Sequence, residues 1–181
     1  MPSKFPWVVF ALEVSCASNT GLPSSPAGVV ADSMTVTSRT FAADGPIPID
    51  ATCDGKNTSP EVSWSSPPEK TQALVVVLED PDAPTPPFTH WLVFDIRPDA
   101  RSLPPGGDVG ALGAKLGLND AREPRYYGPC PPHGPGHHYI LRVIALDKPL
   151  GLREGASRSA VDSAMSGHLL GSGELMGRFV H

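Results

Sequence analysis

Residues 80–94 read DPDAPTPPFTHWLVF, and residues 128–139 read GPCPPHGPGHHY. Each stretch joins a loop rich in proline or glycine to a hydrophobic strand. Each also places a histidine, His90 or His137, at or just before the first residues of that strand. Proline fixes φ and removes a backbone donor, whereas glycine permits close approach of the backbone. Loops of this kind hold polar groups in place, so the two stretches predict the two halves of one small anion pocket.

Strand signals are frequent along the rest of the chain. Apolar and β-branched runs predict strands at residues 34–41, 62–64, 73–78, 90–96 and 139–146. The run at 73–78, ALVVVL, is continuously apolar and is therefore expected to be buried on both faces of a sheet. Proline and glycine clusters between the runs are typical of turns in a β-rich protein.

One good helix signal lies late in the chain. Ser157 can cap a helix in which Val161, Met165 and Leu169 recur at four-residue steps as one apolar stripe. Residues 112–118 are expected to form a short helical turn. Together these elements predict a mainly β fold, an antiparallel β-sandwich with Greek-key connections, short peripheral helices and one C-terminal helix.

Length and charge narrow the class of protein. The chain has 181 residues, which is the length of one domain. Its formal net charge is −5 and it has no basic cluster, which argues against a nucleic-acid partner. The sequence has no apolar run of about 18 residues, so no transmembrane span is expected.

Residues 1–33 are expected to be a leader-like or disordered segment, and residues 34–181 are expected to be the folded domain. Lys4 precedes a short apolar run, and a stretch rich in Ser, Pro, Gly and Ala follows, in the order of a secretory leader. Pro6 within the run and Glu13 near the cleavage region fit a leader poorly. Export to the cell envelope and a cytoplasmic location are therefore equally open.

Several motifs together carry a resemblance to a known family. They are DPDAP at 80–84, the strand at His90, the Gly128–Pro132 loop, the ending His137-x-Tyr139, CDGKNTSP at 53–60 with Trp64, and the C-terminal run between 155 and 178. In this order they resemble the phosphatidylethanolamine-binding protein family, also called the Raf kinase inhibitor protein family, over roughly residues 34–181. The last two pieces are similar to its bacterial branch.

The resemblance implies the same sandwich fold and a phosphate-type anion as ligand, such as a phosphoethanolamine headgroup, with no cofactor. Family members inhibit kinases or proteases in some lineages. A regulatory or inhibitory role toward such a partner is a further expectation, although no residue of this chain carries it. The expected ligand-binding residues are Asp80, His90, Gly128, Cys130, Pro131, His137 and Tyr139.

Strand alternation places His137 and Tyr139 side by side, on the face that also carries Leu141 and Val143. The animal members have a longer stretch between the glycine-rich loop and this ending. We take His137 rather than His138 as the pocket histidine, because only that register keeps the His-x-Tyr pair.

The same alternation places His90 on one face with Leu92, Phe94 and Ile96. A neutral histidine donates one N–H and a protonated one donates two, while a tyrosine adds a phenolic O–H. A pair of core histidines bonded to backbone partners is the alternative. The presence of Tyr139 and two rigid loops beside the two histidines favours the pocket over this alternative.

The loop after Tyr127 supplies backbone groups. The N–H groups of Gly128 and Cys130 could form an anion-binding concavity, with Pro131 and Pro132 as a stiff wall.

Two aspartates, Asp80 and Asp82, precede the strand at His90. An ionised carboxylate only accepts hydrogen bonds and would repel a phosphate, so Asp80 is expected to orient a histidine or to meet an ammonium group. Asp82 is expected to be a turn residue that bonds nearby backbone.

Two alternative functions belong to other classes. A metal site could use His133, His137 and His138 with Asp80, but this spacing is not the helical pair of zinc hydrolases, and adjacent strand residues point to opposite faces. A metal-dependent enzyme or other hydrolase that uses the His90, His137 and Asp80 pocket is the alternative function. No Gly-x-Ser-x-Gly elbow is present, so a non-enzymatic binding module is preferred.

The chain has three cysteines, Cys16, Cys53 and Cys130. The last two lie in the domain, where they are either small, reduced core residues or, in an exported protein, a disulfide. A Cys53–Cys130 bond requires Cα atoms near 5.5 Å apart, and it would tie the Asp54-Gly55 loop to the pocket loop.

Overall fold

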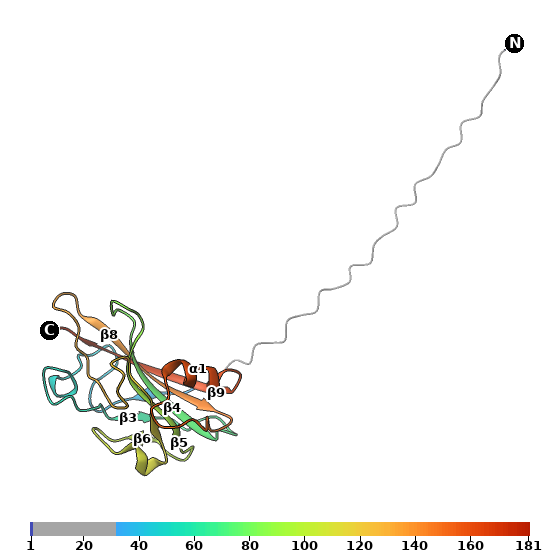
Figure 1. Ribbon diagram of the computed structural model, residues 1–181, viewed down its shortest axis with the longest axis horizontal. Coiled ribbons are helices and arrows are strands. Elements are labelled where there is room, and N and C mark those ends of the chain that lie inside the picture. The colour runs from blue at the N-terminus through green and yellow to red at the C-terminus, as the bar shows by residue number, and fades with distance from the viewer. Residues whose placement is uncertain (2–31) are drawn as a thin grey trace. The chain divides into compact units, whose positions relative to one another are not determined.

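The computed structural model describes Met1 and residues 32–181, and the rest of the leader-like segment lies outside the described residues (Figure 1). In chain order the elements are β1 (Asp32–Ser33), β2 (Val36–Thr37), the 3-10 helix η1 (Ile49–Ala51), β3 (Val62–Trp64), β4 (Ala73–Asp80), β5 (Phe88–Ile96), β6 (Ser102–Leu103), the 3-10 helix η2 (Val109–Leu112), β7 (Lys115–Leu116), β8 (His137–Leu146), α1 (Arg158–Met165) and β9 (Leu169–Phe179).

The strands form two sheets, as the sandwich prediction requires. The large sheet has the order β1-β9-β8-β4-β5-β7, and the small sheet has the order β2-β3-β6. All pairs are antiparallel except β1 with β9. After the β4-β5 pair, a long connection of the Greek-key kind returns β8 to the other side of β4. The predicted mainly β sandwich is confirmed.

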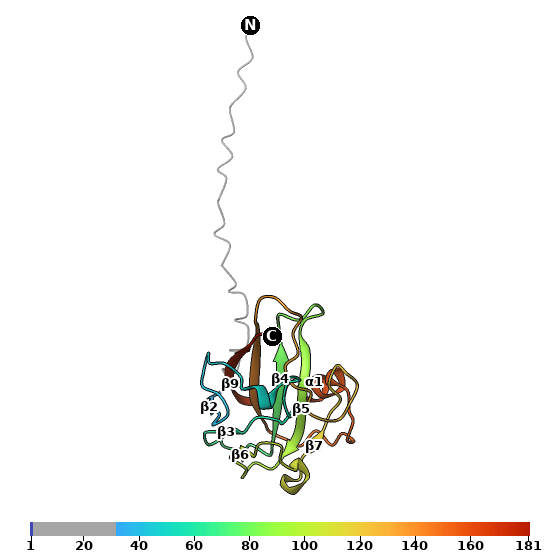
Figure 2. The same cartoon turned by 90° about the vertical axis from the view of Figure 1, so that its left-hand side faces the viewer.

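The large sheet is covered on both faces. Figure 2 shows the small sheet on one side of β4 and β5 and α1 on the other. The main core packs Leu74, Val76 and Leu78 of β4 toward the small sheet, whereas Val75 and Val77 join a second cluster around α1. All eight residues of β4 are buried, which confirms the two-faced burial expected from its apolar run. Burial of each such Val or Leu side chain contributes about 1.5–3 kcal/mol to the free energy of folding.

The N-terminal strands differ from those expected. Asp32 and Ser33 pair with Gly171 and Ser172 of β9, so strand pairing is present before residue 34. The strand predicted at 34–41 is reduced to β2, because side chains beyond it divert the backbone. Arg39 N, for example, donates to Glu61 Oε2 at 2.6 Å.

The helix prediction is correct at its start and wrong at its end. Ser157 Oγ accepts from Ala160 N at 3.2 Å, and Val161 is the buried residue of α1. Leu169, expected as the third residue of the apolar stripe, is instead the first residue of β9. The turn predicted at 112–118 is also displaced, because η2 spans Val109–Leu112 and Lys115–Leu116 form β7.

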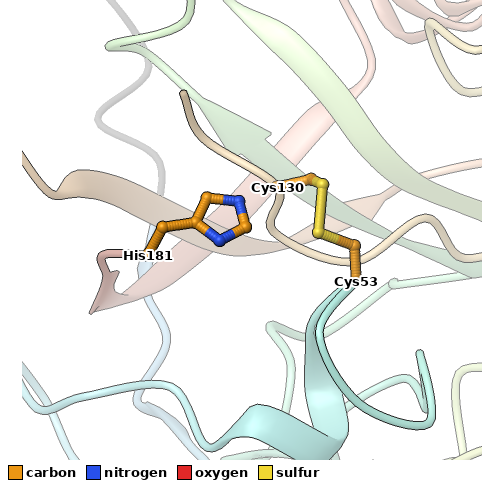
Figure 3. Close-up of side chains that lie close together, drawn as sticks. All are labelled: Cys53, Cys130 and His181. Atoms are coloured by element: carbon orange, nitrogen blue, oxygen red, sulfur yellow. A yellow bond between two sulfur atoms is a disulfide. The ribbon is translucent and has the colours of Figure 1, made fainter. Parts of the chain in front are cut away.

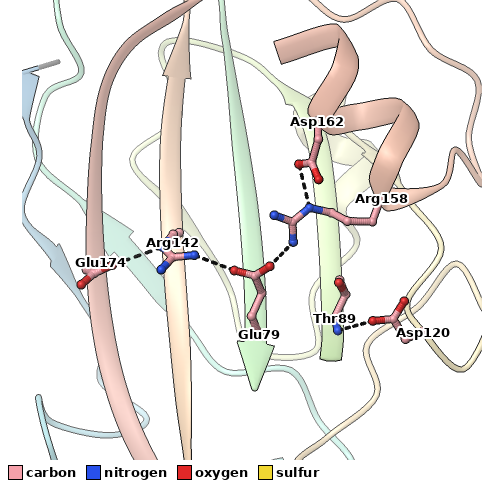
Figure 4. Close-up of polar contacts among 7 residues, drawn as sticks. All are labelled: Glu79, Thr89, Asp120, Arg142, Arg158, Asp162 and Glu174. Carbon is pink, nitrogen blue, oxygen red and sulfur yellow. Dashed lines mark hydrogen bonds and ion pairs between the residues drawn. The ribbon is translucent and has the colours of Figure 1, made fainter. Parts of the chain in front are cut away.

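A charged cluster joins α1 to the face of the large sheet that this helix covers, called here the outer face (Figure 4). The Glu79 side chain is 5% exposed and meets Arg142 Nη1 at 2.6 Å and the guanidinium of Arg158. Arg158 also bonds Asp162 within α1 at 2.8 Å, and Arg142 bonds Glu174 of β9 at 3.2 Å. A buried carboxylate needs such partners to offset the loss of its hydration. This cluster connects three strands and the helix.

Candidate functional site

A cavity of about 260 Å³ lies where β4 ends and where β5 and β8 begin. Its walls come from the loops that follow β4 and precede β8, and its lining residues are Asp80, Ala83, Pro84, Phe88, His90, Tyr127, Cys130, Pro131, Pro132 and His137. Five of the seven expected ligand residues therefore meet in one place. A larger cavity of about 570 Å³, near Arg178 and Phe179, contains none of those seven.

His90 reaches the cavity because of an irregularity in β5. Thr89 pairs with Glu79 and Trp91 pairs with Leu78, so His90 is an additional residue between two paired ones. Its ring consequently lies 5.3 Å from the ring of Tyr139, on the side of the main core.

The expected face of β5 is therefore wrong. Leu92 and Phe94 pack in the cluster around α1. A second register shift, at the positive φ of Asp95, returns Ile96 to the main core.

The His90 ring is held by backbone. Its Nδ1 lies 2.7 Å from the carbonyl oxygen of Tyr127, and because a carbonyl only accepts, Nδ1 is the donor. The residue is 4% exposed. Burial lowers the pKa of His90 below its usual value, and the Tyr127 carbonyl and the charge of Asp80 only partly oppose this.

His137 is held by a carboxylate. Its Nδ1 lies 2.8 Å from Asp80 Oδ2, and the two side chains are 13% and 5% exposed. The other oxygen of Asp80 accepts the backbone N–H of Asp82 at 2.8 Å. The geometry thus gives Asp80 the orienting position anticipated from its chemistry.

Asp82 bonds a distant segment of the chain, so the expectation that its side chain bonds nearby backbone is wrong. It accepts the backbone N–H of His138 at 2.8 Å and lies 2.6 Å from the ring Nδ1 of that residue. Adjacent His137 and His138 consequently point to different partners, and the His133 ring lies beside His181 at 4.9 Å. The set of Asp80, His133, His137 and His138 is not brought together around one point.

Two of the expected ligand residues do not line the cavity. Tyr139 is fully buried behind the histidines, and its hydroxyl is the one buried side-chain polar atom without a partner among the described residues. Burial and the charge of Asp80 raise the pKa of that hydroxyl. The N–H of Gly128 donates to Asn57 Oδ1 at 2.6 Å, so the prediction that it faces an anion is wrong. A Cβ at Gly128 would lie 2.7 Å from the Ala51 carbonyl oxygen, which explains the glycine.

Cys53 and Cys130 form a disulfide, with Cα atoms 5.4 Å apart (Figure 3). The bond joins the loop at Asp54 to the cavity wall, and Cys53 N also donates to the Pro129 carbonyl at 3.0 Å. The cavity wall is therefore anchored covalently to a segment that lies 77 residues away in the sequence.

Sequence reasoning overlooked the aromatic part of the wall. Phe88 lies 4.8 Å from His90 between ring centroids, and Tyr127 lies 6.1 Å from it, nearly stacked. Position is the available signal, since Phe88 lies within the stretch at 80–94 and Tyr127 immediately precedes the stretch at 128–139. Neither has a periodic neighbour that identifies its role.

Comparison with known proteins agrees with this arrangement. The family model described as phosphatidylethanolamine-binding protein matches residues 37–180. The chain belongs to the phosphatidylethanolamine-binding protein family. A UPF0098 protein of Methanothermobacter thermautotrophicus is 42% identical over 149 residues, which cover 81% of this chain and 98% of the relative. A UPF0098 protein of Aquifex aeolicus is 43% identical over 152 residues, with coverages of 81% and 88%.

Two solved bacterial structures of phosphatidylethanolamine-binding protein homologues share the fold. CT736 of Chlamydia trachomatis matches with a TM-score of 0.76 and 35% identity, over 83% of this chain and 99% of that one. YbcL of Escherichia coli matches with a TM-score of 0.76 and 29% identity, over 82% and 98%. The predicted bacterial branch of the family is thereby supported. Within the described residues, no helix has the length and apolar character needed to cross a membrane.

Proposed function

We propose that this family member binds a phosphate-type anion, with phosphoethanolamine as its model ligand, in the cavity between β4, β5 and β8. One observation carries the proposal: His90 and His137 line the same cavity, and each uses Nδ1 for a protein acceptor. The nitrogen left for a ligand is then Nε2 in both rings. Two rings held in this way need little reorganisation when an anion enters.

The fixed Nδ1 donors determine the protonation that binding requires. A neutral ring that donates from Nδ1 has a lone pair on Nε2, which cannot donate to an anion. Either the imidazole gains a proton or the ligand supplies its own P–OH hydrogen. Because burial lowers the pKa of His90, the free cavity favours the neutral ring, and a bound anion would favour the protonated one. Binding should therefore be coupled to proton uptake.

The size and wall of the cavity favour a headgroup-sized ligand. Its volume of about 260 Å³ is below the range of about 300–1,000 Å³ that is usual for drug-sized ligands. The faces of Phe88 and Tyr127 offer a surface that suits an ammonium group through cation–π attraction. Phosphoethanolamine contains both groups that such a cavity can hold.

Binding without turnover is part of the proposal. Among the described residues, no serine hydroxyl is hydrogen-bonded to a histidine, and His90 and His137 are each paired with an acceptor that fixes their orientation. No contact within residues 32–181 distinguishes a kinase partner from a protease partner, so the proposal is confined to the small anion.

Calorimetric titration with phosphoethanolamine and with inorganic phosphate tests the proposal. His90→Ala and His137→Ala should each lose about 1.5–3 kcal/mol of binding free energy, the value of one charge-assisted hydrogen bond. His168→Ala is the matched control, because His168 also bonds a carboxylate through Nδ1, at 2.8 Å from Asp147, but does not line the cavity. Unchanged affinity in both cavity variants, or turnover of a phosphoester that either variant abolishes, would contradict the proposal.

A further inference from the structure

A group of side chains that could bind a metal ion lies beside the anion cavity. Cys53, Cys130 and His181 each offer a ligand atom, and these three atoms lie within 4.8 Å of one another. Figure 3 shows the His181 ring directed toward the disulfide. While the two sulfurs are bonded to each other, neither is a thiolate, and only thiolate sulfur is a strong metal ligand.

His181 is held as a metal-binding histidine usually is. Its Nδ1 lies 3.0 Å from Asp54 Oδ2, and its ring packs against Phe179 at 5.8 Å between centroids. A ligating imidazole generally donates its second ring nitrogen to a carboxylate, which fixes the ring and makes the free nitrogen more basic. Asp54 is the residue next to Cys53, so the same loop provides both a sulfur and this carboxylate.

Reduction would release the two missing ligands in place. A dithiol reductant attacks one sulfur through its thiolate and forms a mixed disulfide. Its second thiol then resolves that bond, so the reductant leaves as a disulfide and both cysteines carry S–H. Cys130 is exposed, which gives a reductant access. Tetrahedral zinc bonds of about 2.3 Å to sulfur and about 2.0 Å to nitrogen place such ligands about 3.5–3.8 Å from one another. The three ligand atoms lie within 4.8 Å of one another, so only short movements of the two released sulfurs and the imidazole are needed to reach these separations.

We propose that reduction of the Cys53–Cys130 disulfide converts this corner into a zinc site formed by the two thiolates and His181, with Asp54 as the positioning residue. Zinc binding then releases the two thiol protons. The fourth position is open to water or to His133, whose ring lies 4.9 Å from that of His181. Cys130 also lines the anion cavity, so the site would link thiol chemistry to the cavity wall.

Cobalt titration of the full chain tests the site, with Co²⁺ as the spectroscopic substitute for zinc. A Cys16→Ser background removes the third cysteine, which lies outside the described residues. The reduced protein should bind one Co²⁺ with thiolate charge-transfer and tetrahedral d–d bands, and Zn²⁺ should displace it. The oxidised protein should show neither band.

Variants distinguish this site from nonspecific binding of Co²⁺ by free thiols. Cys53→Ser should abolish the bands, and His181→Ala should weaken Co²⁺ binding at least about tenfold, with Asp54→Asn losing about 10–100-fold. His168→Ala, the histidine paired with Asp147, should leave the affinity unchanged.

Two results would overturn the proposal: reduced protein that binds no Co²⁺, or equal affinity in His181→Ala and its parent. Thermal melting covers the case in which reduction unfolds the chain. Zn²⁺ should then restore a cooperative transition in the parent and fail to do so in His181→Ala, and a reduced chain that zinc neither binds nor refolds contradicts the site. Anion affinity plays no part in either readout.

Discussion

Glu79 and Asp80 are neighbours on β4, and both are buried, yet their carboxylates have different surroundings. Glu79 points to the outer face, where two arginines from β8 and α1 satisfy it (Figure 4). Asp80 points to the cavity, where its side-chain partner is the single imidazole of His137. Arginine is always protonated, whereas histidine changes its charge near neutral pH. One carboxylate is therefore part of a permanent structural connection, and the next is part of a group that can respond to protons and ligand.

The largest expected effect is on the structural side of this comparison. Glu79→Gln should lower the free energy of unfolding by about 2–4 kcal/mol, because it leaves two guanidinium groups without their shared buried anion. Denaturant unfolding would measure the loss, and the affinity for phosphoethanolamine should not change. Glu174→Gln is the control: it also removes a partner of Arg142, but its side chain is 63% exposed. Its cost should stay within about 1 kcal/mol. Equal losses in the two variants would contradict the distinction.

The next effect belongs to the cavity and depends on pH. The pKa of His90 is lowered in the folded protein, so between that value and the unfolded value of about 6.5 the unfolded chain binds more protons. Without anion, stability should fall as the pH drops through this window, by at most about 1.4 kcal/mol per pH unit. Anion affinity should rise over the same window, because the complex favours the protonated ring.

Thermal melting between about pH 5 and 7.5, with and without phosphoethanolamine, checks both signs. His90→Gln should remove this part of the pH response, while Glu79 and its arginines contribute nothing to it. An affinity that stays flat across the range would mean that neutral donors bind the anion.

A smaller effect is expected at the unpartnered hydroxyl beside Asp80. Tyr139→Phe removes a buried group that has no hydrogen bond among the described residues, so stability should be unchanged or should rise by up to about 1 kcal/mol. Anion affinity should also be unchanged, since Tyr139 does not line the cavity. A loss of affinity in Tyr139→Phe, with a normal melting temperature, would show that the hydroxyl reaches the ligand after all.

The smallest effect is expected from removing residues 1–31. This stretch is rich in Ser, Pro, Gly and Ala and has no sustained amphipathic pattern, so a chain that begins at Asp32 should unfold within about 0.5 kcal/mol of the full protein. Matched denaturant curves and anion titrations would establish this. A large drop in stability would show that residues 1–31 contribute to the stability of the folded domain.

The sequence by itself determined the parts that depend on short-range patterns. Alternation along residues 137–146 correctly places Tyr139, Leu141 and Val143 on the core face of β8, and the apolar run at 73–78 marks the doubly buried β4. The rigid loops and their two histidines indicated the cavity, and together with the motif at 53–60 and the C-terminal run they suggested the family. Residue chemistry alone gave two roles for Asp80, orienting a histidine or meeting an ammonium group, and the contact with His137 agrees with the first.

Only the tertiary structure decided which groups those patterns bring into contact. Strand alternation assumes an unbroken register, and one additional residue in β5 moves His90 to the other face. The N–H of Gly128 is taken by Asn57, 71 residues earlier, and Glu79 is satisfied by Arg158, 79 residues later. The 11-residue strand β9 was also not recognised, because glycines interrupt its apolar pattern and its register comes from pairing with β8. Such contacts depend on which distant segment supplies the partner, and local periodicity contains no information about that choice.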